Sequence, residues 1–346
     1  MTDKKICLAS DNWSPAHPAI IAAIAEANID CVPAYGTDPW TEEAIKLIQE
    51  NFKSSAKVFM VPSGTGANVL ALKLCCRRFE SIICTDVAHI HVQESGAAES
   101  VIGSKLLTVN HQNGKITPQN IIKKLNSERF FGKHATLPRV VSLAQTTEYG
   151  TVYSLKELEE IAKVCKSENL ILHMDGSRLY NAAAKLKINL HELSAHVDIL
   201  SLGGTKNGLL GAEAVVIFNP ALFDGSDHVH KQTLQLVSKT RFISAQYISY
   251  FKTKLWHELA LHANNKAQEL FNIMKNIPGI KINYPVESNQ IFFNTPLSWI
   301  PLIQEKISCM EWDNEKHELR FITSWHTTDQ DVKNTKIILE HIAHNN

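Results

Sequence analysis

Short apolar runs of strand length alternate with helical patterns through the first part of the chain. The seven runs are Val58–Val61, Ser81–Cys84, Leu106–Val109, Val140–Leu143, Leu170–Met174, Ile199–Leu202 and Ala214–Phe218. They are rich in Val, Ile and Leu, as expected for strands that are buried on both faces of a sheet. Between them, the capping box Ser154–Glu157 predicts a helix to about Glu168, and Pro118 predicts one to about Asn126. This alternation predicts an α/β fold with a seven-stranded, mainly parallel sheet.

The pattern changes near Lys231, where a long helical tract begins that we expect to reach Met274. Strand-like segments follow, and the chain closes with another helical pattern. They lie at Gly279–Tyr284, Gln290–Asn294 and Leu319–Thr323, with the last helix from Thr328 to about His344. These elements are typical of a smaller α+β domain.

The chain has 346 residues, which is long for one average domain. We therefore expect a large domain at residues 41–240 and a small C-terminal domain at residues 241–346. Residues 1–40 contain Pro15, Pro18, Pro33 and Pro39. They predict an irregular arm with one short helix near Ala19–Ala27, packed near the small domain.

Composition argues against several classes of partner. Lys plus Arg and Asp plus Glu both number 35, so no net charge favours a nucleic acid or a membrane surface. No apolar run approaches the roughly 20 residues that cross a bilayer, and no apolar signal segment follows the first residues. The seven cysteines form no CxxC pair and predict reduced thiols in the cytoplasm. No HExxH motif occurs, so no metal site is expected.

A glycine-rich turn at Ser63–Asn68 follows one apolar run and precedes a helical pattern. Glycines let the backbone approach a ligand, and the N–H groups of a helix N-terminus favour a phosphate. The turn has no GK[ST] of a Walker loop, and Val69 stands where a dinucleotide fingerprint has its third glycine. An ordinary tight turn is the alternative.

Three further residues stand just beyond predicted strands, where ligands of open α/β sheets bind. Asp175 could pair with the ring nitrogen of pyridoxal phosphate, or it could cap the next helical turn. His89 could stack on a flat ring or move a proton, or it could be a core histidine. Lys206 lies in the glycine turn Gly203–Gly208, where a lysine has the space and fixed position to form a Schiff base. The order of phosphate turn, histidine, aspartate and lysine suits a pyridoxal phosphate enzyme with the aspartate aminotransferase fold.

Motifs over most of the chain resemble the low-specificity L-threonine aldolases, a family of pyridoxal phosphate enzymes within the β-eliminating lyases. The matching segments are Ser10-Asp11-Asn12, Tyr35-Gly36-Thr37-Asp38-Pro39, Ser63–Asn68, His89 with Glu94 and Gly96, His173–Arg178, and Arg320-Phe321-Ile322-Thr323-Ser324-Trp325. The segment Gly203–Gly208 is most similar to a proteobacterial branch that includes phenylserine aldolases.

The resemblance implies a role for each matching residue. Lys206 would hold the cofactor, Asp175 would hold its ring nitrogen and His89 would stack on its ring. The residues implied for the phosphate are Gly64 and Thr65, with Thr205 as a further candidate.

The resemblance also implies residues for the substrate. Ser10, Arg178 and Arg320 would bind its carboxylate, since a guanidinium matches a carboxylate with two hydrogen bonds. Arg178 could also reach the ring hydroxyl of the cofactor. Sites in this family lie between subunits, so Tyr35 and a cation of the Lys231–Arg241 stretch are expected to serve the site of a neighbouring subunit, with Lys231 as the first choice.

One segment departs from the family pattern. Where the family often has Glu-Asn-Thr-His-Asn-Gly after the fourth strand, this chain has Gln145–Gly150, with Glu148 at the histidine position. The family's histidine lies near the β-hydroxyl of the substrate. Glu148 is therefore a candidate base, and a hydrogen-bonded orienting residue or a solvated glutamate are the alternatives.

Together these matches imply a homo-oligomeric lyase of the aldehyde-lyase class, a dimer or a homotetramer, in glycine biosynthesis and threonine catabolism. It would cleave L-threonine, L-allo-threonine or another L-β-hydroxy-α-amino acid such as phenylserine to glycine and an aldehyde. β-Elimination and transamination on the same fold are alternatives and would give a keto acid. An inactive binding or structural relative and a nucleotide-binding protein are alternatives from other classes.

Overall fold

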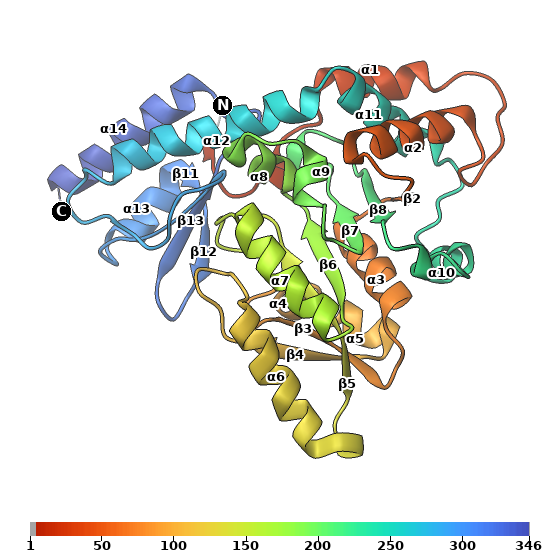
Figure 1. Ribbon diagram of the computed structural model, residues 1–346. Helices are drawn as coiled ribbons and strands as arrows, with labels where there is room; N and C mark the ends of the chain where they lie inside the picture. Colours follow the sequence, from red (N-terminus) through yellow and green to blue (C-terminus); the bar gives the residue numbers. More distant parts are fainter. Residues whose placement is uncertain (1–4, 346) are drawn as a thin grey trace.

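A seven-stranded sheet forms the centre of the computed structural model, which describes residues 5–345 (Figure 1). The strand order is β2 (Lys57–Val61), β8 (Glu213–Ile217), β7 (Ile199–Leu202), β6 (Ile171–Gly176), β5 (Leu137–Ala144), β3 (Glu80–Thr85) and β4 (Lys105–Val109). Neighbouring strands are parallel except where β8 pairs with β2 and β7. The predicted fold class is confirmed, and each of the seven apolar runs is a strand. The first four residues of the expected arm, and residue 346, lie outside the described part.

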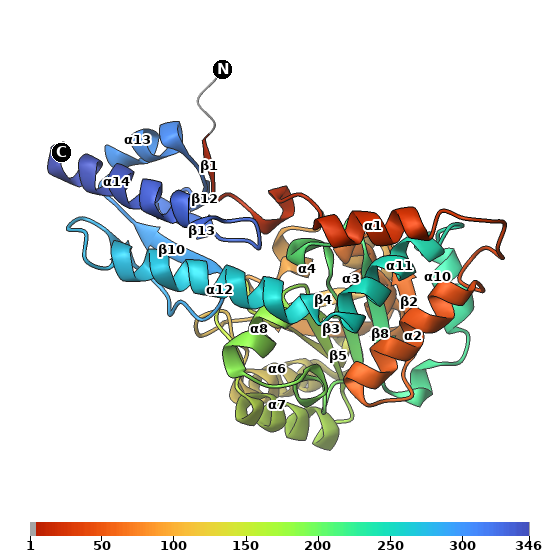
Figure 2. The same ribbon diagram turned by 90° about the horizontal axis from the view of Figure 1, so that it is seen from above.

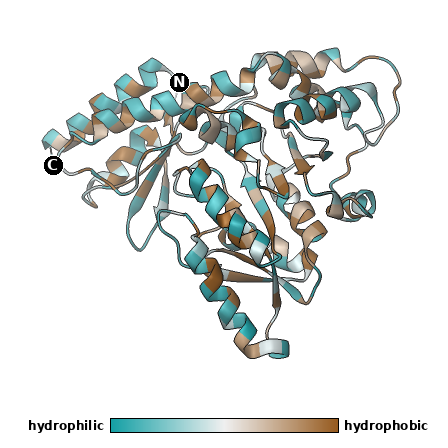
Figure 3. Ribbon diagram, in the orientation of Figure 1, coloured by the Kyte–Doolittle hydropathy of each residue, from teal (hydrophilic) through white to brown (hydrophobic). Residues whose placement is uncertain are grey.

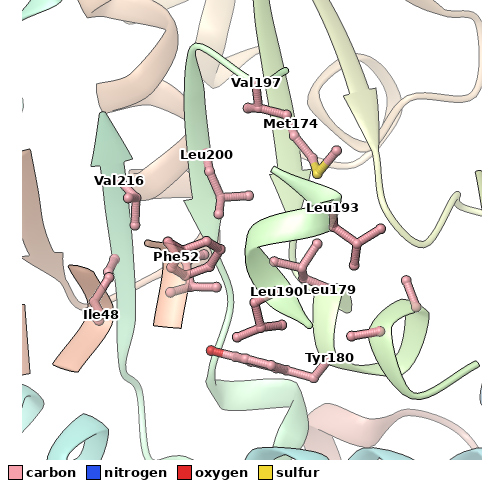
Figure 4. Close-up of a cluster of buried hydrophobic side chains, with 14 of the residues drawn as sticks. Ile48, Phe52, Met174, Leu179, Tyr180, Leu190, Leu193, Val197, Leu200 and Val216 are labelled. Atoms are coloured by element: carbon pink, nitrogen blue, oxygen red, sulfur yellow. The ribbon is translucent and has the colours of Figure 1, made fainter. Parts of the chain in front are cut away.

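Side chains of the strands alternate between two apolar layers. One layer lies under helices α2 (Pro39–Phe52), α6 (Pro118–Phe131), α7 (Leu155–Ser167), α8 (Leu179–Leu186), α9 (Leu190–Leu193) and α11 (Arg241–Lys252). Figure 4 shows part of this layer, where Met174, Leu200 and Val216 of three strands meet Phe52 and Leu190. The opposite layer packs under α3 (Gly64–Cys75), α4 (His89–Val92), α5 (Ala97–Ile102) and α10 (Ser226–Gln232). Both faces of the sheet are therefore buried, which explains the continuous apolar runs.

Local signals set the helix starts. Ser154 accepts from the Glu157 backbone and Glu157 accepts from the Ser154 backbone, so the capping box that opens α7 is present. Helix α6 begins at Pro118 as predicted but continues to Phe131, one turn beyond the expected end. In Figure 3 the central strands are largely brown, whereas the outer helices mix brown and teal, as amphipathic helices do.

A second, four-stranded antiparallel sheet forms the C-terminal part. Its order is β12 (Met310–Asp313), β13 (Glu318–Ile322), β10 (Gln290–Asn294) and β9 (Lys281–Ile282). Helices α13 (Trp299–Lys306) and α14 (Asp329–Asn345) pack in its apolar cluster. The start of the chain joins this part, because β1 (Ile6–Cys7) pairs in parallel with β11 (Ile307–Ser308). The helix of the arm, α1 (Pro18–Glu26), packs instead in the core of the large sheet through Ile20, and the three-part division at residues 40 and 240 stays a prediction.

The prediction of one continuous helical tract from Lys231 is wrong. The structure has three helices there: α10 ends at Gln232, α11 spans Arg241–Lys252, and α12 spans Leu255–Met274. Leu234 and Lys254 stand between them with φ values of 63° and 56°, a left-handed conformation that a helix cannot continue. Neither residue is the glycine or proline that marks such a break in sequence, so the pattern alone could not show it.

Helix α12 belongs to both parts of the molecule, as the view from above shows (Figure 2). Its first half, including Leu259 and Ala260, lies in the core of the large sheet, and its second half, including Leu270 and Met274, lies in the core of the small sheet. Trp256 accepts a hydrogen bond at its carbonyl from Asn207, 2.9 Å away, and Ala263 accepts one from Thr323, 2.7 Å away. Within residues 5–345, no helix combines the length and apolar character needed to cross a membrane.

Candidate active site

A pocket of about 270 Å³ lies where β6 and β7 end beside the first turn of α3. It brings together six residues that the sequence singled out from distant segments. These six are Gly64, Thr65, His89, Asp175, Thr205 and Lys206. The carboxyl ends of parallel strands meet at one edge of a sheet, and this common edge is why the residues converge.

The first turn of α3 presents free backbone donors to the pocket. Ser63 caps the helix by accepting from the Gly66 N–H at 3.1 Å. The N–H groups of Gly64 and Thr65 have no acceptor within the helix, because the first turn of a helix lacks one. A methyl group added at Gly64 would meet no atom within 4 Å, and both Gly64 and Thr65 line the pocket. The turn thus fits an anionic group such as a phosphate.

Asp175 and His89 are linked through two side chains that the sequence did not single out as site residues. Asn68 donates from Nδ2 to Asp175 Oδ2 and to Glu94 Oε1, both at 2.9 Å. Glu94 Oε1 also lies 2.7 Å from His89 Nδ1. Asn68 stands in the glycine turn and Glu94 in the motif after His89, but an amide and a glutamate carry no chemical signal by themselves.

Asp175 remains a carboxylate despite its burial. Burial alone would raise the pKa of Asp175, but the charges of Lys206 and His89 and the hydrogen bond from Asn68 outweigh it and lower the pKa. Asp175 also accepts a hydrogen bond from the Ser177 N–H at 2.9 Å. It does not cap the next helix, because α8 has no side-chain cap. A buried carboxylate at this edge suits a cationic ring nitrogen.

Two polar atoms beside the pocket lack a partner in the described part of the chain: Asn68 Oδ1 and Glu94 Oε2. Both are acceptors shielded from solvent, so they do not bind an anionic group. The free donors of α3, the Asp175 carboxylate and Lys206 together fit pyridoxal phosphate.

Lys206 stands in a short 3-10 helix, Thr205–Asn207, directly after β7. The glycines before it are required by close backbone contacts. An added Cβ would lie 2.6 Å from Ser177 Cα at Gly203 and 2.4 Å from the Ala212 carbonyl oxygen at Gly204. Burial and the charge of Arg178 lower the pKa of Lys206, while Asp11, Asp175 and Glu213 act in the opposite direction. A lysine with a lowered pKa is a better nucleophile towards a carbonyl group.

Arg178, one of two arginines expected to bind a carboxylate, already binds one from the chain. Its Nε donates to Asp11 Oδ2 at 2.7 Å and its Nη2 donates to Asp11 Oδ1 at 2.9 Å. Asn289 donates to the same Asp11 oxygen at 3.0 Å. Burial alone would raise the pKa of Asp11, but the charge of Arg178 and its hydrogen bonds outweigh burial and lower this pKa.

Arg320 is different, because it has no carboxylate partner among the ion pairs of residues 5–345. The residue is 8 % exposed, its Nε has no acceptor, and its guanidinium lies 4.3 Å from the centroid of the Trp312 ring. Burial and the charge of Arg178 lower the pKa of Arg320 to about 10. Such a cation is poised for an anionic ligand.

Ser10 accepts the Asn12 N–H at 3.2 Å and caps the short helix that carries Asp11. Asn12 lines the pocket, whereas Ser10 is not among the residues that line it.

Glu148 lies in a small cavity that adjoins the pocket, since His89 and Asp175 line both. Its Oε1 accepts from the His89 backbone N–H at 3.1 Å. Burial raises the pKa of Glu148 to about 7. Glu148 is half-buried and hydrogen-bonded, which favours a base or an orienting residue over a solvated glutamate.

Tyr35 and Lys231 meet on the surface and not in the pocket of their own chain. Lys231 Nζ lies 4.4 Å from the centroid of the Tyr35 ring, and half of Tyr35 (51 %) is exposed. Leu234, three residues after Lys231, is 88 % exposed. The described residues contain no group of three or more His, Cys, Asp or Glu side chains arranged to hold a metal ion.

Comparisons with known proteins show the family of the chain. The family described as Beta-eliminating lyase matches residues 8–296. The chain is similar to the low specificity L-threonine aldolases of Pseudomonas sp. (strain NCIMB 10558), at 38% identity, and of Pseudomonas aeruginosa, at 39% identity. Both matches run over 336 residues and cover 96% of each chain.

Among solved structures, threonine aldolase of Leishmania major superposes with a TM-score of 0.93 at 29% identity, covering 97% of this chain and 99% of the other. The expected lyase class and dependence on pyridoxal phosphate are confirmed by these matches. The chain belongs to the beta-eliminating lyase family, within its low specificity L-threonine aldolases.

Proposed function

We propose that the protein cleaves L-threonine, L-allo-threonine or a bulkier L-β-hydroxy-α-amino acid such as phenylserine to glycine and an aldehyde. The relatives named for L-threonine support the substrate class. The observation that carries the reaction type is Glu148, a desolvated carboxylate beside His89 at the edge of the pocket. Cleavage of the Cα–Cβ bond needs a group that takes the β-hydroxyl proton, and Glu148 supplies one.

Different residues of the pocket would bind different parts of the cofactor. Pyridoxal phosphate supplies an electron-accepting ring that weakens the bonds at the substrate Cα. Lys206 would hold it covalently, Asp175 would keep its ring nitrogen protonated, and His89, oriented by Glu94, would stack on its ring. The N–H groups of Gly64 and Thr65 would bind the phosphate, while Thr205, the further candidate, already donates its hydroxyl to Glu213 and accepts from the Ala212 N–H.

The amino-acid carboxylate binds to Arg320, the arginine without a carboxylate of its own. Arg178 adds its remaining donor, Nη1, since Nε and Nη2 are committed to Asp11. Ser10 completes this end of the site and holds the segment that carries Asp11.

Glu148 acts as the general base for the hydroxyl. A base works best when its pKa is close to the working pH, and burial raises the Glu148 pKa to about 7. The hydrogen bond from the His89 N–H fixes one carboxylate oxygen and leaves Oε2 for the substrate.

Product analysis tests this function. Purified protein with pyridoxal phosphate and L-threonine should give equal amounts of glycine and acetaldehyde. Lys206→Ala serves as the control that lacks the cofactor lysine. A keto acid and ammonia in place of glycine would establish β-elimination, and no product from any β-hydroxy amino acid would refute the proposal.

We also propose a cytoplasmic homo-oligomer in which Tyr35 and Lys231 serve a neighbouring site. Their contact on the surface beside the exposed Leu234 supports an interface, and seven unpaired cysteines suit a reducing compartment. Mixing inactive Lys206→Ala and Lys231→Ala subunits tests the shared site. Mixed oligomers should regain activity, because one of their sites has both lysines; no gain would place Lys231 in the site of its own chain.

A further inference from the structure

A buried carboxylate that has no part in the proposed reaction lies in the same pocket as Lys206. Glu213 on β8 is 6 % exposed and lines the pocket. Its Oε2 accepts the Gly204 N–H at 2.9 Å, and its Oε1 accepts the Thr205 N–H at 3.4 Å. These two N–H groups belong to the residues immediately before Lys206. Both oxygens of Glu213 are therefore used to hold the turn that carries the lysine.

The other carboxylates near Lys206 have different partners. Asp11 is bound by Arg178 with two hydrogen bonds. Asp175 accepts from Asn68 and Ser177 and is assigned to the ring nitrogen of the cofactor. Among the described residues, Glu213 forms no ion pair, unlike Asp11, which forms a buried ion pair with Arg178. Burial raises the pKa of Glu213, and the charge of Lys206 acts against that rise, so Lys206 is the cation that its pocket offers.

We propose that Glu213 is a positioning residue for Lys206: its carboxylate fixes the Gly204-Thr205 turn and supplies the negative charge that balances the lysine nitrogen after the cofactor has engaged Asp175. This inference rests on the proposed role of Lys206 as the cofactor lysine. Glu213 does not touch the reacting atoms; it acts through Lys206.

The charged groups that act on Lys206 come from three elements. They are Asp11 of the first 3-10 helix, Asp175 and Arg178 at the end of β6, and Glu213 of β8. The positive charge of Arg178 lowers the pKa of Lys206, whereas the negative charge of Glu213 raises it. Loss of the Glu213 charge should therefore let the effect of Arg178 dominate further. Tyr180, Tyr247 and Tyr250 also lie within the field of Glu213, and burial raises the pKa of each phenol, which keeps all three neutral.

The test is a pH titration of the visible absorption of the resting protein loaded with pyridoxal phosphate. Glu213→Gln keeps the size of the side chain but removes its charge and one acceptor. The pH midpoint of the Schiff base band should fall by about one unit or more, the effect of one charge at short range in a protein. A midpoint equal to that of the wild type would overturn the proposal.

Asp198→Asn is the matched control. Asp198 also accepts a backbone N–H, that of Leu172 at 2.8 Å, but it lies before β7 and does not line the pocket. This variant should lose stability and keep the wild-type midpoint. An equal shift in Asp198→Asn would mean that loosening the sheet alone moves the midpoint, which would also refute the role of Glu213.

Two further measurements keep the outcomes separate. If Glu213→Gln does not fold, Glu213→Asp retains the charge and should titrate near the wild-type midpoint; a shift of a full unit in this variant would contradict a charge effect. The absence of a band in the wild type, or its survival in Lys206→Ala, would refute the cofactor assignment and leave the contacts of Glu213 unaffected.

Discussion

Arg178 and Asp11, 167 residues apart in sequence, form a buried ion pair with two parallel hydrogen bonds of 2.7 and 2.9 Å. The pair fastens the segment after β1 to the end of β6. The pair also distinguishes the two arginines to which the family motifs give the same role. Arg178 has a carboxylate partner within the chain, whereas Arg320 has none among the described residues. This difference supports the proposal that Arg320, although not among the residues that line the pocket, is the main anchor for a substrate carboxylate.

Asp11→Asn should destabilise the protein by about 3–5 kcal/mol near neutral pH, because it leaves the buried Arg178 charge unpaired. The Asp11 pKa is lowered in the fold, so the contribution of the pair is present above the ordinary carboxyl pKa and is lost as pH falls through the lowered value. Urea unfolding at neutral and acidic pH measures the difference, which should shrink in acid. Asp227→Asn, which breaks an exposed pair with Lys57, should cost no more than about 1 kcal/mol.

Arg320→Gln should weaken the binding of glycine by about 10- to 100-fold, the value of a hydrogen bond to a charged group. Spectral titration of the loaded protein with glycine measures the affinity. The same change should not lower the stability of the cofactor-free protein, because it removes a desolvated and unpaired cation. Unchanged glycine affinity would assign the carboxylate to Arg178 instead; Arg129→Gln, an exposed arginine paired with Glu168, is the control.

Glu148→Gln should lower kcat for L-threonine by about 100- to 10,000-fold, the usual contribution of a general base. In the wild type, activity should rise with pH around 7, where Glu148 loses its proton, and this rise should disappear in the variant. A variant that keeps both its rate and its pH profile would show that Glu148 only orients His89. Gln keeps the acceptor for the His89 N–H, so the comparison isolates the proton transfer.

The same variant should be more stable than the wild type in alkaline solution. The Glu148 pKa rises from 4.5 to about 7 on folding, so the stability it contributes is present below pH 4.5 and is lost as pH rises to about 7. Above that pH the buried charge costs on the order of 3 kcal/mol, which glutamine avoids. Thermal unfolding of the cofactor-free proteins across this pH range should show a gap that widens from acid to neutral pH and then stays constant.

Gly203→Ala should cost about 1–3 kcal/mol through overpacking, since its methyl group would lie 2.6 Å from Ser177 Cα. Because the strain falls on the turn before Lys206, the variant should also form less of the borohydride-reducible Schiff base. Gly64→Ala places its methyl in open space and should leave the stability of the cofactor-free protein unchanged. Equal losses in both variants would show that the strain is not specific to the lysine turn.

The large sheet could be predicted because its strands are buried on both faces and stand out as apolar runs, such as Ile199–Leu202. The small sheet was harder: β12 is half exposed and polar in part, and β9 is two residues long, so neither forms a run. The breaks at Leu234 and Lys254 depend on tertiary packing, which imposes a left-handed conformation on residues that do not favour it.

In the site, residues with distinctive chemistry at strand ends were found from the sequence, among them Lys206, Asp175 and His89. The side chains that hold them were not. Asn68 lies within a helix and Glu213 within a strand, and only the fold brings their polar atoms to the pocket. Such residues are indistinguishable in sequence from ordinary polar ones until their partners are known.

Helix α12 sets a fixed length inside the enzyme. Asn207, next to Lys206, is tied to Trp256, and Thr323, close to Arg320, is tied to Ala263, so the two ties are about 10 Å apart along a rigid rod. The helix thus fixes the distance between the lysine and the proposed carboxylate anchor. Inserting one residue between Trp256 and Ala263 would turn one tie by about 100° relative to the other, changing which amino acids fit without altering any side chain in the pocket.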